Sequence, residues 1–195
     1  MEKQIRRYEV VVVGTSAGGF NALSMIFESI PADYPIPIIV VQHRAKDSQD
    51  LFEEVLQRKC TIAIKQADEK EKIRPGRIYI APPDYHLLVE SDKSFSLSSD
   101  ALVHFSRPSI DVLFESAALA YKDKVVGILL TGANNDGASG IVMIKKMGGM
   151  TIAQDPQEAQ YAMMPQAAIE TNSVQFVWRL SEIREFVRGL AVLGM

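Results

Sequence analysis

The stretch VVVGTSAGGFNAL, residues 11–23, combines three local signals. Three valines ahead of a glycine are typical of a strand buried on both faces of a parallel sheet. The glycine-rich segment from Gly14 to Gly19 predicts a tight turn, and the apolar residues after it predict a helix. Such a turn either cradles a phosphate or presents a nucleophile, so Ser16 is the first candidate functional residue.

Length, composition and charge limit the class of protein. The chain has 195 residues, which suits one domain with its own hydrophobic core. Its 47% hydrophobic and 23% charged residues are typical of a globular protein, and a formal net charge of −3 argues against a nucleic-acid partner held by counterion release. The N-terminal residues read as a first strand rather than a signal peptide, and no apolar run could span a bilayer. We therefore expect a cytoplasmic protein without membrane insertion.

The single cysteine, Cys60, excludes an intramolecular disulfide framework and a cysteine-based zinc site. It lies where a predicted helix runs into a predicted strand. We expect a buried, unreactive thiol there.

Strand and helix patterns alternate along most of the chain, as in proteins built on a parallel sheet. A turn-rich segment, residues 74–98, predicts an antiparallel excursion that forms a hairpin at the sheet edge. The chain is thus expected to be one α/β domain, residues 1–195, with a doubly wound, mostly parallel, Rossmann-like three-layer sheet. The expected strands are residues 8–14, 36–42, 61–64, 125–130 and 150–153. The expected helices are residues 20–30, 47–59, 137–147, 165–171 and 181–190, and residues 174–177 lie between the last two. A further helix is expected to begin at residues 108–109, with Ser109 as its cap.

Polar side chains follow three of the predicted buried strands. Ser16 comes after the first, His43 after the second, and Asp136 after the strand that ends in LLTG. Because ligands and catalytic groups gather at the carboxyl ends of the strands in such a sheet, we expect these three residues to share one edge.

Ser16 has three interpretations. Residues 14–18 fit the G-x-S-x-G turn, in which small neighbours expose a nucleophilic serine between a strand and a helix. A phosphate-binding turn is disfavoured, because the lysine of a P-loop, the full G-x-G-x-x-G spacing and an acidic residue after the strand 36–42 are all missing. The glycines could also serve only the packing of the helix on the strand.

Of the three histidines, His43 is the candidate general base, because it directly follows an apolar strand at the functional edge. His86 and His104 lie in the turn-rich excursion or at its exit. We interpret both as ordinary surface or edge residues.

Asp136 lies in the loop TGANNDGASG, which opens a helix. It could cap that helix, and it could also orient one ring nitrogen of His43 so that the other takes the proton of Ser16. Asp84 and Asp111 are rival acids, but Asp136 follows a buried strand and a small-residue loop. The order Ser, His, Asp differs from that of the α/β-hydrolases, chymotrypsin and subtilisin.

These residues, in this order, resemble the catalytic domain of the chemotaxis receptor methylesterases, the CheB (protein-glutamate methylesterase) family. The resemblance runs from residue 11 to about residue 181. It rests on GTSAGG, VVQH, PGRIYIAPPDYH, RPSIDVLFESAA, LTGANNDGASG and TIAQDPQEAQYAMMPQAAI.

The resemblance implies a Ser16–His43–Asp136 triad that hydrolyses glutamate γ-methyl esters on the cytoplasmic helices of chemoreceptors and releases methanol. Deamidation of receptor glutamines is a second implied reaction. No metal or organic cofactor is implied. Backbone N–H groups of Ala17 and Ala133 are the implied oxyanion donors.

The chain departs from the family pattern at several positions. The usual L-T-G-M-G-x-D-G loop has Ala133 in place of Met and Asn134 in place of Gly, and Asn134 matters if that position needs a positive φ. Ser106 replaces the usual His before Arg-Pro-Ser. Family members commonly carry an N-terminal receiver domain, and this sequence contains none. The chain is thus either a stand-alone catalytic unit that is controlled in another way or part of a larger polypeptide.

Two alternatives to an active methylesterase stay open at this point. One is a catalytically weak or inactive adaptor of the same family, altered in the loop 131–137. The other is a flavodoxin-like or Rossmann-like nucleotide-binding protein.

Overall fold

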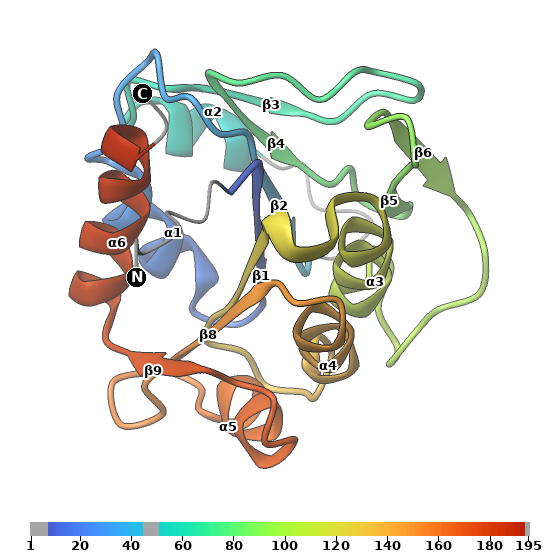
Figure 1. Cartoon of the computed structure of the whole chain (residues 1–195), viewed down its shortest axis with the longest axis vertical. Coiled ribbons are helices and arrows are strands. Elements are labelled where there is room, and N and C mark those ends of the chain that lie inside the picture. The colour runs from blue at the N-terminus through green and yellow to red at the C-terminus, as the bar shows by residue number, and fades with distance from the viewer. Residues whose placement is uncertain (1–7, 45–50, 194–195) are drawn as a thin grey trace, which may run out of the picture.

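Seven parallel strands form the central sheet of the computed structural model, which describes residues 8–44 and 51–193 (Figure 1). Their order across the sheet is β3-β4-β2-β1-β7-β8-β9. The strands are β1 (Val10–Thr15), β2 (Ile38–Gln42), β3 (Ala63–Gln66), β4 (Arg77–Ile80), β7 (Val125–Leu129), β8 (Met150–Gln154) and β9 (Phe176–Trp178).

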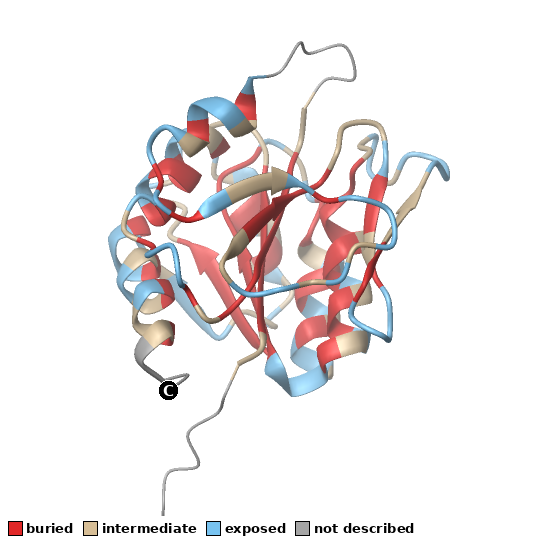
Figure 2. Cartoon of the chain, turned by 90° about the horizontal axis from the view of Figure 1, so that it is seen from above, coloured by how far each residue is buried: buried red, intermediate tan, exposed pale blue. Residues whose placement is uncertain are grey.

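Both faces of the sheet are covered by helices, which explains why its inner strands are almost continuously apolar. Alternate residues of β1 point to opposite faces, so Val11 and Val13 lie in one hydrophobic core while Val10 and Val12 lie in the other. Figure 2 shows the buried sheet between helices whose outer surfaces are exposed. One core is closed by α1 (Gly19–Phe27), α2 (Phe52–Gln57) and α6 (Leu180–Leu193), and the other by α3 (Ile110–Tyr121), α4 (Ala138–Lys146) and α5 (Met163–Glu170).

The doubly wound α/β fold expected from the sequence is confirmed, and most boundaries shift by a few residues only. The predicted helix 47–59 is the shorter α2, and its first residues, 47–50, lie outside the described part of the chain. The segment between the last two helices supplies β9, and a single 3-10 turn, η1 (Lys122–Lys124), connects α3 to β7. None of the helices in the described ranges is both long and apolar enough to cross a membrane.

The prediction for residues 74–98 was wrong in part. Its first strand, β4, pairs in parallel between β2 and β3, so it belongs to the main sheet. Only β5 (His86–Val89) and β6 (Phe95–Ser98) form an antiparallel hairpin, and they make a separate two-stranded sheet rather than an edge of the main one. Leu87 and Phe95 bury this hairpin in the core shared with α3. A four-residue apolar strand looks the same in either setting, because the pattern does not reveal its partner.

Cys60 is buried, as expected, at the end of the α2 segment. Burial, with a smaller contribution from the charge of Glu28, raises the pKa of its thiol to about 11. The thiolate is therefore scarce at neutral pH, which fits an unreactive side chain.

The loops after β2, β1 and β7 start at the same edge of the sheet, because these strands are parallel neighbours in that order. These are the loops that contain His43, Ser16 and Asp136.

Candidate active site

The turn after β1 depends on the absence of side chains at two glycines. A Cβ on Gly14 would lie 2.3 Å from a methyl group of Ile110, the first residue of α3. Gly18 has φ of 80° and precedes α1, a left-handed conformation that favours glycine. The chain can therefore turn sharply at Ser16 while α3 approaches the end of β1.

Backbone and side-chain hydrogen bonds join the three loops. The Ser16 N–H donates to the carbonyl of Thr131 (3.0 Å), and the His43 N–H donates to the carbonyl of Thr15 (3.1 Å). The Gln42 amide donates to the carbonyls of Ser16 and His43, both at 2.9 Å. Ser16 and His43 are thus held in adjoining positions, each partly exposed.

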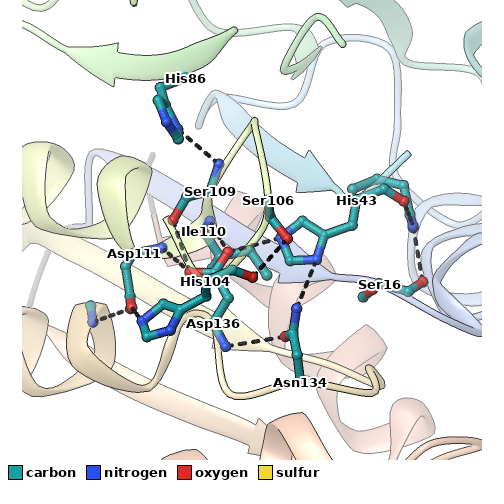
Figure 3. A network of polar contacts seen from close by, with 12 residues as sticks. Ser16, His43, His86, His104, Ser106, Ser109, Ile110, Asp111, Asn134 and Asp136 are labelled. Atoms are coloured by element: carbon teal, nitrogen blue, oxygen red, sulfur yellow. Dashed lines mark hydrogen bonds and ion pairs between the residues drawn. The ribbon is translucent and has the colours of Figure 1, made fainter. Parts of the chain in front are cut away.

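His43 and Asp136 form a partly buried pair, with 2.8 Å between His43 Nε2 and Asp136 Oδ2 (Figure 3). The His43 side chain is 11% exposed and that of Asp136 is fully buried. His43 Nδ1 is thereby left for a second partner on the open side of the ring. The structure thus places the His43 ring in direct contact with the Asp136 carboxylate.

Asp136 also receives three hydrogen bonds from the start of α3. Its Oδ1 accepts from the Ser109 hydroxyl (2.8 Å) and the Asp111 N–H (3.0 Å), and its Oδ2 accepts from the Ile110 N–H (2.7 Å). Burial alone would raise the pKa of Asp136, but the hydrogen bonds from His43, Ile110 and Asp111 outweigh it and hold the pKa below its usual value. The Asp136 carboxylate is therefore ionised at neutral pH.

One of the two capping predictions was wrong, and the other was right about the residue. Asp136 does not cap the helix that follows it, since Gly137 is the N-cap of α4, with φ of 96°. Asp136 instead accepts the first N–H groups of α3, a helix that begins 26 residues earlier in the chain. Ser109 is the N-cap of α3 but does not bond its own helix, because its hydroxyl donates to Asp136.

Asn134 contacts both members of the pair. Its Nδ2 lies 3.4 Å from His43 Nδ1, and its Oδ1 accepts the Asp136 N–H at 3.1 Å. Its φ is not positive, so the replacement of glycine at this position causes no left-handed strain. The Ser16 hydroxyl makes no hydrogen bond with any residue of the described ranges 8–44 and 51–193. The amide of Asn134, rather than the Ser16 hydroxyl, is the group beside His43 Nδ1 (Figure 3).

The proposed oxyanion donors are available for a ligand. Across the described ranges, the N–H groups of Ala17 and Ala133 donate to no protein acceptor. Ala17 is half-buried beside Ser16, and Ala133 is exposed in the loop after β7. The Thr131 hydroxyl donates to the Ala17 carbonyl (2.9 Å), which ties the two loops together.

The interpretation of His86 as a surface or edge residue was wrong, because it is 2% exposed. Its Nδ1 accepts the Ser109 N–H at 3.1 Å and its Nε2 lies 3.0 Å from the Ala101 carbonyl. His104 is exposed, as expected, with its Nε2 3.2 Å from Asp111 Oδ2.

Neither rival acid reaches His43. Asp84 forms an ion pair with Arg107. Asp111 is buried at the start of α3 and accepts the Gly140 N–H at 2.7 Å. Burial first, and then the nearby charge of Asp136, raise the pKa of Asp111 to about 6, although the Gly140 N–H opposes the shift.

Metal-ligand atoms of His104, Asp111 and Asp136 lie within 4.8 Å of one another. Each Asp136 oxygen, however, already accepts two hydrogen bonds from the protein. The donor set fits a hydrogen-bonded network better than a cation site.

Two side chains that hold the pair were not identified as site residues from the sequence. Ser109 was assigned only to its own helix, and Asn134 was treated only as a backbone question. A serine directly before a helix gives no sign that a carboxylate from another loop will take over its capping role.

Comparisons with known proteins agree with this geometry. Residues 11–187 match the family model described as CheB methylesterase. The crystal structure of the Thermotoga maritima CheB methylesterase catalytic domain superposes with a TM-score of 0.89 at 33% identity, covering 94% of this chain and 98% of that one.

Curated relatives extend the match. A Leptospira interrogans protein, provisionally named protein-glutamate methylesterase/protein-glutamine glutaminase, is 50% identical over 93% of this chain and 94% of its own length. An Archaeoglobus fulgidus protein named protein-glutamate methylesterase/protein-glutamine glutaminase is 37% identical over 93% of this chain, which spans about half (53%) of that relative. The chain belongs to the CheB methylesterase family.

Proposed function

We propose that this chain is a protein-glutamate methylesterase, which hydrolyses glutamate γ-methyl esters on the cytoplasmic helices of chemoreceptors and releases methanol. The observation that carries the proposal is the hydrogen-bonded pair of His43 and the buried Asp136, held beside Ser16 at the carboxyl edge of the sheet. Deamidation of glutamine side chains is the same acyl chemistry with ammonia as the leaving group, and the names of the relatives include it.

Ser16 is the nucleophile of the proposed reaction. Its Oγ attacks the ester carbonyl and passes its proton to His43. The accepting atom is Nδ1, because Nε2 already donates to Asp136. Asp136 remains ionised and stabilises the imidazolium that forms, and Asn134 must move away from Nδ1 for Ser16 to reach it.

The N–H groups of Ala17 and Ala133 are the proposed oxyanion donors, since neither is used by the protein in the described ranges. His43 then protonates the departing methoxide, which leaves as methanol. Water attacks the acyl-enzyme with His43 again as base, and glutamate and free Ser16 are restored. One oxyanion donor contributes about 3 kcal/mol of transition-state stabilisation, so the position of the loop 131–137 sets the rate.

We further propose that residues 1–195 act as a single catalytic domain in the cytoplasm, where the substrate helices are located. Neither a metal nor an organic cofactor takes part in the proposed steps. A nucleotide-binding role has no specific support, because the side chain that ends β2 is Gln42, which is occupied by the carbonyls of Ser16 and His43.

The test is methanol release from receptor fragments that carry methylated glutamates. Wild type is expected to release methanol, and Ser16→Ala is expected to lose at least about 1,000-fold of that activity. Ser29→Ala, a half-buried serine at the end of α1, is the matched control and should behave as wild type. A folded wild type that releases no methanol and no ammonia would overturn the proposal in favour of an inactive adaptor.

A further inference from the structure

Asp136 lies at one end of a buried chain of hydrogen bonds whose other end is His86. The Ser109 hydroxyl donates to Asp136 Oδ1, and the Ser109 N–H donates to His86 Nδ1. Ser109 is fully buried and His86 is 2% exposed. One serine thus connects the acid of the proposed triad to a histidine on a different element, the hairpin strand β5 (Figure 3).

The partners of His86 define its tautomer. Nδ1 accepts a backbone N–H, so it carries no proton, while Nε2 lies 3.0 Å from the carbonyl of Ala101 and donates its proton to it. The imidazole is therefore a neutral link between the loop after β6 and the start of α3. Each ring nitrogen thus makes one hydrogen bond, Nδ1 as an acceptor and Nε2 as a donor.

Ser109 must be held in place for Asp136 to be oriented. The residue precedes α3, and the next two N–H groups, those of Ile110 and Asp111, also donate to Asp136. A rotation of the Ser109 peptide would move its hydroxyl away from Oδ1 and displace the first N–H groups of the helix. His86 is the group that fixes the direction of the Ser109 N–H.

We propose that His86 is a positioning residue of the reaction assigned to this site, so the inference rests on the proposed function. His86 Nδ1 fixes Ser109, Ser109 and the start of α3 fix both oxygens of Asp136, and Asp136 fixes His43. A histidine that served only to anchor the loop at Ala101 would use Nε2 alone.

Two substitutions separate the roles of the nitrogens. His86→Asn places an acceptor oxygen near the position of Nδ1 and gives up the contact with Ala101. His86→Gln places a donor near the position of Nε2 and leaves the Ser109 N–H unpaired. Each loses one buried hydrogen bond, so their losses of thermal stability should be similar.

We expect kcat for methanol release to fall about 10-fold in His86→Gln with KM unchanged, and to stay within about 3-fold of wild type in His86→Asn. Equal losses in the two variants, or a loss in KM alone, would overturn the inference. Ser109→Ala provides a second measurement if His86→Gln does not fold: it keeps the bond to His86 but removes the hydroxyl, and wild-type kcat in this variant would also overturn the inference.

A readout that does not require turnover distinguishes failure of the inference from failure of the proposed function. The proton between His43 Nε2 and Asp136 should give a downfield ¹H NMR resonance in wild type. We expect this resonance to be kept in His86→Asn and shifted or lost in His86→Gln and Ser109→Ala. If wild type releases neither methanol nor ammonia, the proposed function fails, and the inference is then decided by the resonance alone. If the resonance is the same in all variants, His86 does not position Asp136.

Discussion

Asp136 has two roles at the scale of the single residue: it orients His43, and it accepts three hydrogen bonds from the start of α3. Ser16, in contrast, contributes no side-chain hydrogen bond within the described ranges. Substitutions at the two positions should therefore abolish activity alike but affect stability very differently.

We expect Asp136→Asn to lower kcat about 10³- to 10⁴-fold and the free energy of unfolding by about 3 kcal/mol. The substitution replaces one carboxylate oxygen, which accepts two hydrogen bonds, with an NH₂ group, which can accept none. Ser16→Ala should change the free energy of unfolding by less than about 0.5 kcal/mol. Denaturant unfolding of both variants at pH 7 checks this contrast, and equal stability losses would contradict it.

The pKa of Asp136 lies below its usual value of 3.8, so the bonds to the carboxylate stabilise the native state above that pH. This contribution is lost as the pH falls through the lowered native pKa. The difference in the free energy of unfolding between wild type and Asp136→Asn should therefore have its largest value above about pH 4 and become smaller at lower pH.

The amide of Asn134 lies 3.4 Å from His43 Nδ1, the atom that accepts the proton of Ser16 in the proposed mechanism. We expect Asn134→Ala to raise the rate at which a fluorophosphonate labels Ser16 by about 3-fold, since a weak hydrogen bond no longer opposes the approach of the serine. Asn135→Ala, at the exposed neighbouring position, is the control and should label at the wild-type rate. A slower Asn134→Ala would mean that the amide supports the base rather than competing with it.

At the scale of the element, two buried carboxylates, those of Asp111 and Asp136, lie close together at the start of α3. Asp136 is kept ionised there, while the pKa of Asp111 is raised to about 6 by burial and by the charge of Asp136. A carboxyl with a raised native pKa binds its proton more tightly when folded, so its ionisation destabilises the native state as the pH rises from about 4 through 6.

Asp111→Asn should remove this penalty and still accept the Gly140 N–H through its amide oxygen. We expect the variant to match wild type in stability at pH 4 and to exceed it by about 2 kcal/mol at pH 8. Unfolding curves at the two pH values give the result. A variant less stable than wild type at pH 8 would show that the contact with His104 outweighs the burial of the charge.

The sequence predicts an element correctly where its local pattern of apolar and polar residues matches the way the element is buried in the fold. The apolar runs of β1, β2, β7 and β8 are buried on both faces, so the pattern alone identifies them. Residues 78–80 are also apolar, but whether they join the parallel sheet or a hairpin depends on partners far along the chain. The role of Asp136 at α3 was missed for the same reason, since a capping group can come from another loop.

At the scale of the whole molecule, the order of the strands assembles the site. His43, Ser16 and Asp136 are distant in sequence, yet their strands β2, β1 and β7 are neighbours at the centre of the sheet. The sequence could place the three residues at one edge but could not show that Asn134 occupies the free side of His43 or that His86 is buried, because both depend on tertiary packing.

The central strands should also be the most stable part of the molecule. We expect amide hydrogens of β1 and β7, which are paired on both sides, to exchange last, and those of β3 and β9, which end the seven-stranded sheet, to exchange first. Hydrogen exchange followed by mass spectrometry gives the order. Slower exchange in β9 than in β1 would mean that a partner covers that edge in solution.

The central claim is that the turn after β1 presents a nucleophile activated by His43. The most direct test is the site and rate of labelling by a fluorophosphonate, read by mass spectrometry in wild type and in His43→Ala. The account predicts a single adduct on Ser16, formed at least about 100-fold more slowly in His43→Ala. An adduct on another residue, or equal rates in the two proteins, would contradict it.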